Sequence, residues 1–419
     1  MSKVNEGHLK LLTFNCWGLK YVLKLREERL KAIAEKLAVT DHDLVALQEI
    51  WVEEDWQYIE RLCLNRFPYR RFFKAGIIAG PGLALLSSVP IESTFLYRFP
   101  INGRPSAFFR GDWLVGKSIA VTILKPHVPG ARQLAVLNSH MHAPYSQHGD
   151  ASYSTHRACQ AWDLAKVVKV LQRAGYAVVQ VGDLNSKPGL LPYKLFTQEG
   201  GLSDSWEALH GEDSLLNDEI ALLAPHEQVT LGGITCDSRL NTWRAHREPW
   251  EACRLDYALI DRRALTPIAA EIQFTDLLDT PHLCSYSDHF AYSVTLKLKD
   301  QLLLQPIATK LELMKLYTET LHELQDYLDH TIPFQSLWRK CHFYLSLLLV
   351  VGIHVGITFA ATVQPWASVL LAFASTVIGI TGVVNGMICF MGVRSEKRAL
   401  LEVKMEVEDS LRGIEDISQ

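Results

Sequence analysis

The sequence predicts an α/β fold followed by a pair of membrane-spanning helices. Short apolar runs recur through the chain up to Asp300, and each is bounded by polar residues. Runs of this kind are typical of strands that are buried on both faces, as in sheets covered by helices. Beyond Asp300 the composition changes to two long stretches that lack Asp, Glu, Lys and Arg. These observations place a sheet-forming domain before a helical tail.

Four of the apolar runs are predicted strands with a polar residue just past their end. They cover residues 9–14, 43–47, 134–137 and 176–181. In open α/β sheets, ligands bind beyond the strand ends. We therefore expect the polar residues that follow these strands, together with the segment Ser287-Asp288-His289, to form one site.

The polar segments contain candidate ligands for a divalent metal and for a phosphate group. Glu49 and Asp288 offer carboxylate oxygens, which Mg²⁺ prefers together with waters and substrate phosphate. Asn15 and Asn185 can donate hydrogen bonds to phosphate oxygens without adding negative charge. This chemistry favours a magnesium-dependent site that cleaves phosphoesters.

Three further residues suit proton transfer and charge stabilisation. Asp183 and His289 are candidates to take the proton from an attacking water, and His140 is a candidate to stabilise charge on phosphorus. Each residue alone is more often a turn residue, a helix cap or a satisfied core residue than a catalytic one. Their joint occurrence, in this chain order, favours the catalytic interpretation.

The composition limits the classes of partner and compartment. The chain has 419 residues, 48% of them hydrophobic, which is enough for one large or two modest domains. Its net charge of −4 disfavours a general nucleic-acid binder, because such domains are usually basic. The eight cysteines show no Cys-x-x-Cys spacing, and the amino terminus does not match a signal peptide. We expect reduced thiols in a domain that faces the cytosol.

Two uncharged stretches, residues 342–363 and 366–393, predict a transmembrane hairpin. Each exceeds the roughly 20 residues that a helix needs to cross a bilayer core. Basic residues flank both outer ends, namely Arg339 and Lys340 before the first stretch and Arg394, Lys397 and Arg398 after the second. This distribution places both ends of the hairpin on the cytoplasmic side. The alternative is a pair of buried core helices in a soluble protein.

The segments that flank the hairpin show the apolar spacing of amphipathic helices. The apolar positions are Met314, Tyr317, Leu321, Leu324 and Leu328 before it, and Leu400, Val403, Val407, Leu411, Ile414 and Ile417 after it. They either pair in an antiparallel stalk, join two copies of the protein as a homodimer, or pack on the globular domain or the lipid surface. His354, inside the first span, is either a polar contact between the two helices or a functional group.

These observations divide the chain into four predicted parts. A catalytic domain covers residues 1–300 and an amphipathic linker covers 301–340. The transmembrane hairpin covers 341–393, and a cytosolic amphipathic helix covers 394–419.

Residues 111–118 read Gly-Asp-Trp-Leu-Val-Gly-Lys-Ser and match the phosphate-loop pattern of nucleotide-binding proteins. A true phosphate loop follows a buried strand and opens a helix. Here the residues that follow, 118–124, are rich in β-branched side chains and typical of a strand. We therefore expect no nucleotide site. Lys117 and Asp112 remain candidates for contact with the substrate phosphate, with a purely structural lysine as the alternative.

The segments around Asn15, Glu49, Asp183, Asp256 and His289 together resemble the endonuclease/exonuclease/phosphatase superfamily. The resemblance implies a four-layered α/β/β/α sandwich of the DNase I-like type. It also implies phosphoester cleavage with Mg²⁺, for which Mn²⁺ is an expected substitute.

Two groups of segments narrow this resemblance. The first group is similar to neutral sphingomyelinases and comprises residues 15–18, 48–51 and 139–143 with the tail hairpin. The second group is similar to fungal inositol phosphosphingolipid phospholipases C and comprises residues 95–105, 111–118 and 253–257. The resemblance covers residues 8–299 strongly and the tail mainly in architecture.

The resemblance implies a metal site and a general base. Glu49 would hold the metal, with help from Asn15 and Asp288. His289 would be the general base, and Asp256 would orient its ring.

The resemblance also implies how the substrate would be positioned. Asp183 and Asn185 would position water and phosphate, and His140 would support the pentavalent transition state. Lys117 and Asp112 would contact the substrate, as the corresponding stretch is implicated in the activity of the fungal enzymes.

The function implied is that of a membrane-anchored phospholipase C-type phosphodiesterase in sphingolipid catabolism. It would hydrolyse inositol phosphosphingolipids to ceramide and a phosphorylated head group at the endoplasmic reticulum or the mitochondrial outer membrane. The alternatives are a neutral sphingomyelinase acting on sphingomyelin or lyso-phospholipids and, more remotely, a nuclease or an inositol-phosphate phosphatase. The resemblance implies activation by anionic phospholipids, although only scattered basic residues between Arg61 and Lys74 offer a surface for them.

Overall fold

The computed structural model describes residues 8–20, 23–126, 132–211, 217–278, 283–299 and 308–416. The chain forms two compact units. The first unit comprises residues 1–102 and 114–316, and the second comprises residues 103–113 and 317–419. The second unit therefore includes a short segment from the middle of the chain as well as the tail.

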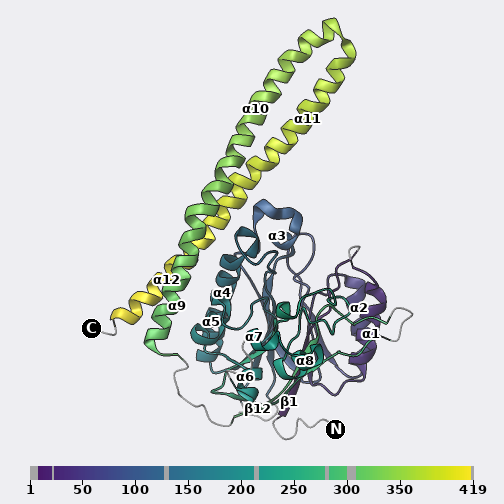
Figure 1. Cartoon of the computed structure of the whole chain (residues 1–419), viewed down its shortest axis with the longest axis vertical. Coiled ribbons are helices and arrows are strands. Elements are labelled where there is room, and N and C mark those ends of the chain that lie inside the picture. The colour runs from purple at the N-terminus through teal and green to yellow at the C-terminus, as the bar shows by residue number, and fades with distance from the viewer. Residues whose placement is uncertain are drawn as a thin grey trace. The chain divides into compact units, whose positions relative to one another are not determined.

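The first unit contains two six-stranded sheets (Figure 1). The first sheet has the order β11-β12-β1-β2-β4-β3, formed by β1 (His8–Asn15), β2 (Leu44–Gln48), β3 (Tyr69–Phe72), β4 (Ala84–Ser87), β11 (Leu265–Gln273) and β12 (Ala291–Leu298). The second has the order β5-β6-β7-β8-β10-β9, formed by β5 (Ile91–Arg98), β6 (Ser118–Leu124), β7 (Leu134–His140), β8 (Ala177–Asp183), β9 (Ser203–Asp204) and β10 (Asp256–Ile260).

Apolar side chains from both sheets form one core, and helices cover the outer faces. Leu11 and Ala46 of the first sheet share a buried cluster with Val136 and Val179 of the second. The helices α1 (Arg26–Ala38) and α2 (Glu53–Leu62) bury Ile33 and their other apolar residues against the first sheet, in a second cluster. The helix α4 (Ser154–Arg173) contacts β8. The predicted α/β sandwich is confirmed.

Short helices in the connections complete the first unit. They are α5 (Leu191–Lys194), α6 (Ser205–His210), α7 (Asn217–Ile220) and α8 (Pro225–Gly232). A further short helix, α3 (Asp112–Val115), precedes β6. Because Ser118 begins a strand and not a helix, the phosphate-loop pattern lacks the helix that a nucleotide loop requires.

The strand registers explain why the polar residues converge. β1 and β2 run parallel with Asn15 beside Gln48, so that Glu49 follows directly. β7 and β8 also run parallel and pair His140 with Asp183. β10 runs antiparallel to β8 and pairs Asp256 with the same Asp183.

Gly182 allows the close approach of β7 and β8 at this end of the sheet. Its φ is +126°, and a Cβ atom added there would lie 2.0 Å from the carbonyl oxygen of Ser139. A side chain of any kind would force the two strands apart just before His140 and Asp183.

The second unit contains two long helical segments that form a hairpin (Figure 1). Its helices are α9 (Lys310–Asp326), which begins in the first unit, α10 (Ile332–Val363), α11 (Pro365–Met387) and α12 (Arg394–Asp416). A turn of π-helix at Tyr327–Thr331 joins α9 to α10, and another at Ile388–Val393 joins α11 to α12. The two segments qualify as candidate membrane spans by length and composition.

Small and polar residues line the contact between α10 and α11. A Cβ atom on Gly382 would lie 2.4 Å from Cβ of Ser346, so only glycine permits this approach. His354 contacts the hydroxyl of Ser375 at 3.4 Å, which is the polar helix contact expected from the sequence. Only 6% and 11% of the most apolar windows are buried. The alternative of two buried core helices is therefore wrong for the structure.

The flanking helices are linked within one chain. The hydroxyl of Tyr327 donates a buried hydrogen bond of 2.8 Å to Oε1 of Glu396. Leu324 before the hairpin and Leu400, Val403 and Val407 after it are all buried. These contacts support pairing of the flanking helices in the chain itself, whereas a homodimer stays a prediction.

Candidate active site

Asn15 lies at the centre of the residues predicted to form the site. Its Nδ2 donates hydrogen bonds to Oε1 of Glu49 at 3.1 Å and to Oδ2 of Asp183 at 3.0 Å. Its Oδ1 accepts from the backbone N–H of Trp17 at 3.0 Å, which fixes the orientation of the amide. The amide thus joins a residue of each sheet, as expected from the ends of β1, β2 and β8.

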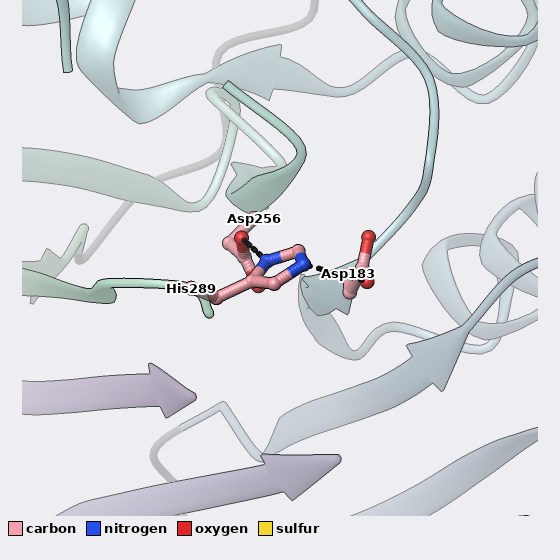
Figure 2. Close-up of side chains that lie close together, drawn as sticks. All are labelled: Asp183, Asp256 and His289. Atoms are coloured by element: carbon pink, nitrogen blue, oxygen red, sulfur yellow. Dashed lines mark hydrogen bonds and ion pairs between the residues drawn. The ribbon is translucent and has the colours of Figure 1, made fainter. Parts of the chain in front are cut away.

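His289 lies between two aspartates (Figure 2). Its Nδ1 donates to Oδ2 of Asp256 at 2.7 Å, because an ionised carboxylate can only accept. This bond leaves Nε2 directed at Asp183, whose Oδ2 lies 3.9 Å away. All three side chains are buried. The arrangement presents one ring nitrogen to the site and holds the other.

The electrostatics of this group raise the pKa values of both His289 and Asp183. Burial alone would lower the pKa of His289, but Asp256 and Asp183 raise it well above 6.5. Burial raises the pKa of Asp183 to about 7, against the opposing effect of His289. Groups poised in this way are typical of proton-transfer sites.

Glu49 and Asp288 form the oxygen-rich part of the site. Burial, and then the charge of Asp288, raises the pKa of the Glu49 carboxyl. Glu49 also adopts the left-handed backbone conformation, with φ at 58°, which is uncommon outside glycine. A half-buried and a buried carboxylate that repel each other, beside the Asn15 amide, fit a hard divalent cation.

A second set of side chains also has metal-ligand geometry. One ligand atom from each of Asp183, Asp256 and His289 lies within 4.8 Å of the others, and all three residues are buried. Because Nδ1 of His289 carries the proton that it donates to Asp256, that nitrogen has no lone pair for a metal. The lone pair is then on Nε2, so a metal held by this ring would occupy the same nitrogen that a transferred proton needs.

His140 lies between Asp183 and Glu49. Its Nε2 lies 3.6 Å from Oδ2 of Asp183 and 3.8 Å from Oε1 of Glu49. Burial, with the nearby charge of Lys117, lowers its pKa well below 6.5. The ring is therefore neutral and can donate one N–H toward a group held at these carboxylates.

Asn185 and Lys117 converge on the backbone that follows His140. Asn185 donates from Nδ2 to the carbonyl oxygen of Met141 at 3.1 Å, and Lys117 donates from Nζ to the same oxygen at 3.0 Å. Lys117 is buried. Asp112 belongs to the second unit, so its predicted substrate contact, like that of Lys117, stays a prediction.

Two arginines support the site and were not expected from the sequence. Arg29 is buried and donates to the carbonyl oxygens of Trp17 at 2.8 Å and Tyr286 at 2.9 Å. It thereby joins the segment after β1 to the segment before Asp288. Arg244 donates from Nη2 to Oδ2 of Asp288. No local pattern signals either residue, because their partners lie far away in the chain.

Comparisons with known proteins agree with this geometry. A model of the endonuclease/exonuclease/phosphatase family matches residues 12–289. The chain belongs to this family. It is 50% identical to the inositol phosphosphingolipids phospholipase C of Saccharomyces cerevisiae, over 96% of this chain and 90% of the yeast protein.

A mouse enzyme and a bacterial toxin are similar to the chain to lower degrees. The chain is 31% identical to sphingomyelin phosphodiesterase 2 of Mus musculus, over 70% of this chain and 65% of the mouse protein. The crystal structure of beta toxin from Staphylococcus aureus superposes with a TM-score of 0.51 and 18% identity, over 68% of this chain and 99% of that one. The latter likeness supports the fold alone.

Proposed function

We propose that the protein is a membrane-anchored phospholipase C-type phosphodiesterase that hydrolyses inositol phosphosphingolipids. The products would be ceramide and a phosphorylated head group. The observation that carries the proposal is the 50% identity, along nearly the whole length of both chains, to the yeast inositol phosphosphingolipids phospholipase C. The buried His289–Asp256 pair beside Asp183 is the chemistry that such a hydrolysis needs.

Some of the site residues would bind a metal, and others would transfer a proton. Glu49, Asp288 and Asn15 would hold a divalent cation, which we take to be Mg²⁺ because the donor atoms are all hard oxygens. When bound, the ion would neutralise the phosphate and polarise its bond to the leaving oxygen. The charge of a bound ion would also favour the neutral form of His289, since it would oppose the carboxylates that raise the pKa of that ring.

Side chains of the protein would transfer the proton and orient the attacking water. Nε2 of His289 takes the proton of the attacking water, while Asp256 holds the ring through Nδ1. Asp183 accepts from the same water and is held by Asn15. His140 donates to the phosphate as negative charge develops on it.

The tail would hold the catalytic unit at the bilayer. We propose that α10 and α11 cross the membrane, with both termini and the catalytic unit in the cytosol, because basic residues flank both outer ends of the uncharged stretches. The same proposal places the protein in the endoplasmic reticulum or the mitochondrial outer membrane. It also includes activation by anionic phospholipids and dimerisation through the tail.

Sphingomyelin is the second candidate substrate. The 31% identity to mouse sphingomyelin phosphodiesterase 2 favours it, and the two substrates share the ceramide phosphodiester. Nucleic acid is a less favoured substrate, because the net charge is −4 and phosphate-binding surfaces for nucleic acid are usually basic.

One assay separates these substrates. The purified full-length protein in vesicles, with Mg²⁺, is incubated with inositol phosphoceramide, sphingomyelin or a duplex containing an abasic site. We expect release of ceramide chiefly from inositol phosphoceramide, and no release by His289→Ala. The exposed His226→Ala serves as the matched control and should retain activity. Cleavage of DNA without ceramide release, or full activity of His289→Ala, would refute the proposal.

A further inference from the structure

Residues 103–113 leave the sequence of the catalytic domain to pack in the second unit. They form a loop whose two ends lie close together. A Cβ atom added to Gly103, which has φ of +124°, would lie 3.0 Å from both Cβ of Asp112 and the backbone nitrogen of Trp113. Between these ends, Pro105–Arg110 form a short 3₁₀-helix. We call residues 103–113 the base loop.

The base loop is fixed to the foot of the hairpin by two contacts. Arg339 in α10 donates from Nη2 to the carbonyl oxygen of Ser106 at 3.0 Å, and this guanidinium is buried. On the other helical segment, a Cβ atom on Gly392 would lie 2.6 Å from Cβ of Pro105. Glycine at 392 thus lets the loop and the segment meet closely. Both helical segments of the hairpin hold the same loop.

The position of these contacts along the helices of the hairpin can be read from the sequence. Arg339 lies one turn before the uncharged stretch that begins at His342, and Gly392 lies at the end of the stretch that closes at Val393. A residue advances a helix by about 1.5 Å, so both contacts fall within roughly 5 Å of the ends of the uncharged stretches. In a bilayer that is the cytoplasmic boundary between head groups and acyl chains.

The side chains that the base loop exposes suit this boundary. Phe109 is 75% exposed, Phe108 is 44% exposed and Trp113 is 38% exposed. At the same level of α10, Trp338 packs against the guanidinium of Arg339, with 4.1 Å from Cζ to the ring centroid. Aromatic and basic residues are enriched at membrane interfaces, where rings meet both acyl chains and head groups.

We propose that the base loop is a membrane-interface element whose Phe108 and Phe109 insert into the cytoplasmic leaflet. Its partner is the lipid bilayer, at the level of the head-group and acyl-chain boundary. The proposal rests on the proposed crossing of the membrane by α10 and α11. It adds a third contact with lipid, made by the chain of the catalytic domain itself. Because Lys117 lies eight residues after Phe109, at most about 29 Å of extended chain separates such an anchor from a residue of the candidate site.

Spin labels on single cysteines test the depth of insertion. Each label is placed in full-length protein carrying Cys341→Ser, which removes the one described cysteine that is exposed. The positions are Phe109→Cys in the loop, Leu348→Cys on the exposed face of α10, and Phe95→Cys on β5 of the first unit, where Phe95 is 47% exposed. Accessibility to oxygen and to a water-soluble nickel complex reports whether each label lies in lipid or in water.

We expect labels at 348 and 109 to be shielded from nickel and the label at 95 to be accessible. A shielded label at 348 with an accessible label at 109 would overturn the base-loop proposal and leave the membrane anchor intact. Accessibility at both 348 and 109 would overturn the anchor and the loop together. The two failures are therefore distinguishable.

A kinetic test uses the same pair of phenylalanines. Phe108→Ser with Phe109→Ser should lower turnover of substrate in vesicles by about ten-fold, because two buried aromatic contacts with lipid are lost. Turnover of a short-chain substrate dissolved as monomers should stay within two-fold of the wild type. Phe95→Ser should change neither rate. An equal loss on both substrates would indicate a damaged fold and contradict the proposal, as would an unchanged rate on vesicles.

Discussion

Nδ1 of His289 donates a 2.7 Å hydrogen bond to Asp256, and this single contact fixes both the tautomer and the direction of the ring. Asp256 begins β10 and pairs with Asp183 on β8, so the backbone places the two carboxylates on either side of the imidazole. The pairing makes Nε2 the nitrogen that faces the site. If Nε2 accepts a proton, its availability therefore depends on Asp256, which contacts the other ring nitrogen.

Asp256→Asn tests this dependence. The amide can donate to Nδ1 and thereby stabilise the other tautomer, which has its proton on Nε2 and cannot act as the base. We expect kcat to fall by about 10²- to 10⁴-fold, with an unchanged far-ultraviolet circular dichroism spectrum. Asp256→Glu should recover part of the rate.

Asp261 provides the matched control for this substitution. It is a buried aspartate just past the other end of β10, where it pairs with Arg263 at 2.8 Å. Asp261→Asn should leave kcat within two-fold of the wild type. An equal loss of kcat in both variants would mean that the strand, and not the tautomer of His289, is what the substitutions disturb.

Glu49→Gln tests both the destabilisation that the half-buried carboxylate causes and its proposed role as a metal ligand. Burial and Asp288 raise the pKa of Glu49, so its ionised form destabilises the folded protein when no metal is bound. This contribution favours folding below the ordinary pKa of about 4.5 and is lost as pH rises through the raised value. At pH 7 without metal, we expect the free energy of unfolding of the variant to be about 1 kcal/mol higher than that of the wild type.

The same variant should lose the stabilisation that Mg²⁺ provides. At a concentration 100-fold above its dissociation constant, a bound ion stabilises the folded state by about 2.7 kcal/mol. Differential scanning calorimetry with and without Mg²⁺ measures both effects, and the exposed Glu271→Gln is the control. Full Mg²⁺ stabilisation of Glu49→Gln would contradict its assignment as a ligand.

The sequence was sufficient for those parts of the site that lie at strand ends. Asn15 and Asp183 end β1 and β8, and Glu49 follows β2, so the polar residues that follow each apolar run located all three. The link between Asp256 and His289 came from the family resemblance, since nothing local marks a partner 33 residues away. Local patterns report local structure, whereas this contact depends on the pairing of β10 with β8.

Contacts between distant segments account for what the sequence did not predict. Arg29 joins Trp17 to Tyr286, a partner 257 residues along the chain, and looks like any helix-face arginine in the sequence. The base loop is a second example, because Arg339 and Ser106 are separated by 233 residues. The phosphate-loop pattern of residues 111–118 overlaps only the end of this loop, whose defining feature is its packing on the hairpin.

Gly182→Ala should disrupt the approach of β7 to β8. The added Cβ would lie 2.0 Å from the carbonyl oxygen of Ser139, and the backbone has φ of +126°. We expect a loss of at least about 3 kcal/mol in the free energy of unfolding, since both a backbone clash and strain oppose the change. Gly175→Ala has φ of +94° but nothing within 4 Å of its new Cβ.

The comparison of the two variants isolates the close approach. Gly175→Ala should cost only the strain, about 1 kcal/mol. Urea denaturation monitored by tryptophan fluorescence measures both. Equal losses would show that β7 and β8 can separate without cost. Because His140 and Asp183 follow directly, Gly182→Ala should also lower turnover under conditions in which the protein remains folded.

His42 predicts how the stability of the catalytic unit depends on pH. Its ring is buried between two hydroxyl groups. Oγ1 of Thr40 lies 2.5 Å from Nδ1, and Oγ of Ser293 lies 2.9 Å from Nε2. Burial, with the positive charge of Lys10, lowers its pKa from 6.5 to about 4. The unfolded chain therefore binds a proton more readily than the folded protein, and the stability that depends on this residue is fully present above pH 6.5. It is lost as pH falls from 6.5 to 4, by an amount on the order of 2–3 kcal/mol.

His42→Gln keeps a polar side chain that does not titrate. Its free energy of unfolding should therefore vary less between pH 7 and pH 4.5 than that of the wild type, although its stability at pH 7 should be lower. Urea denaturation across this range measures the two slopes. The exposed His226→Gln should reproduce the wild-type slope, and a slope for His42→Gln equal to that of the wild type would show that other groups cause the loss at low pH.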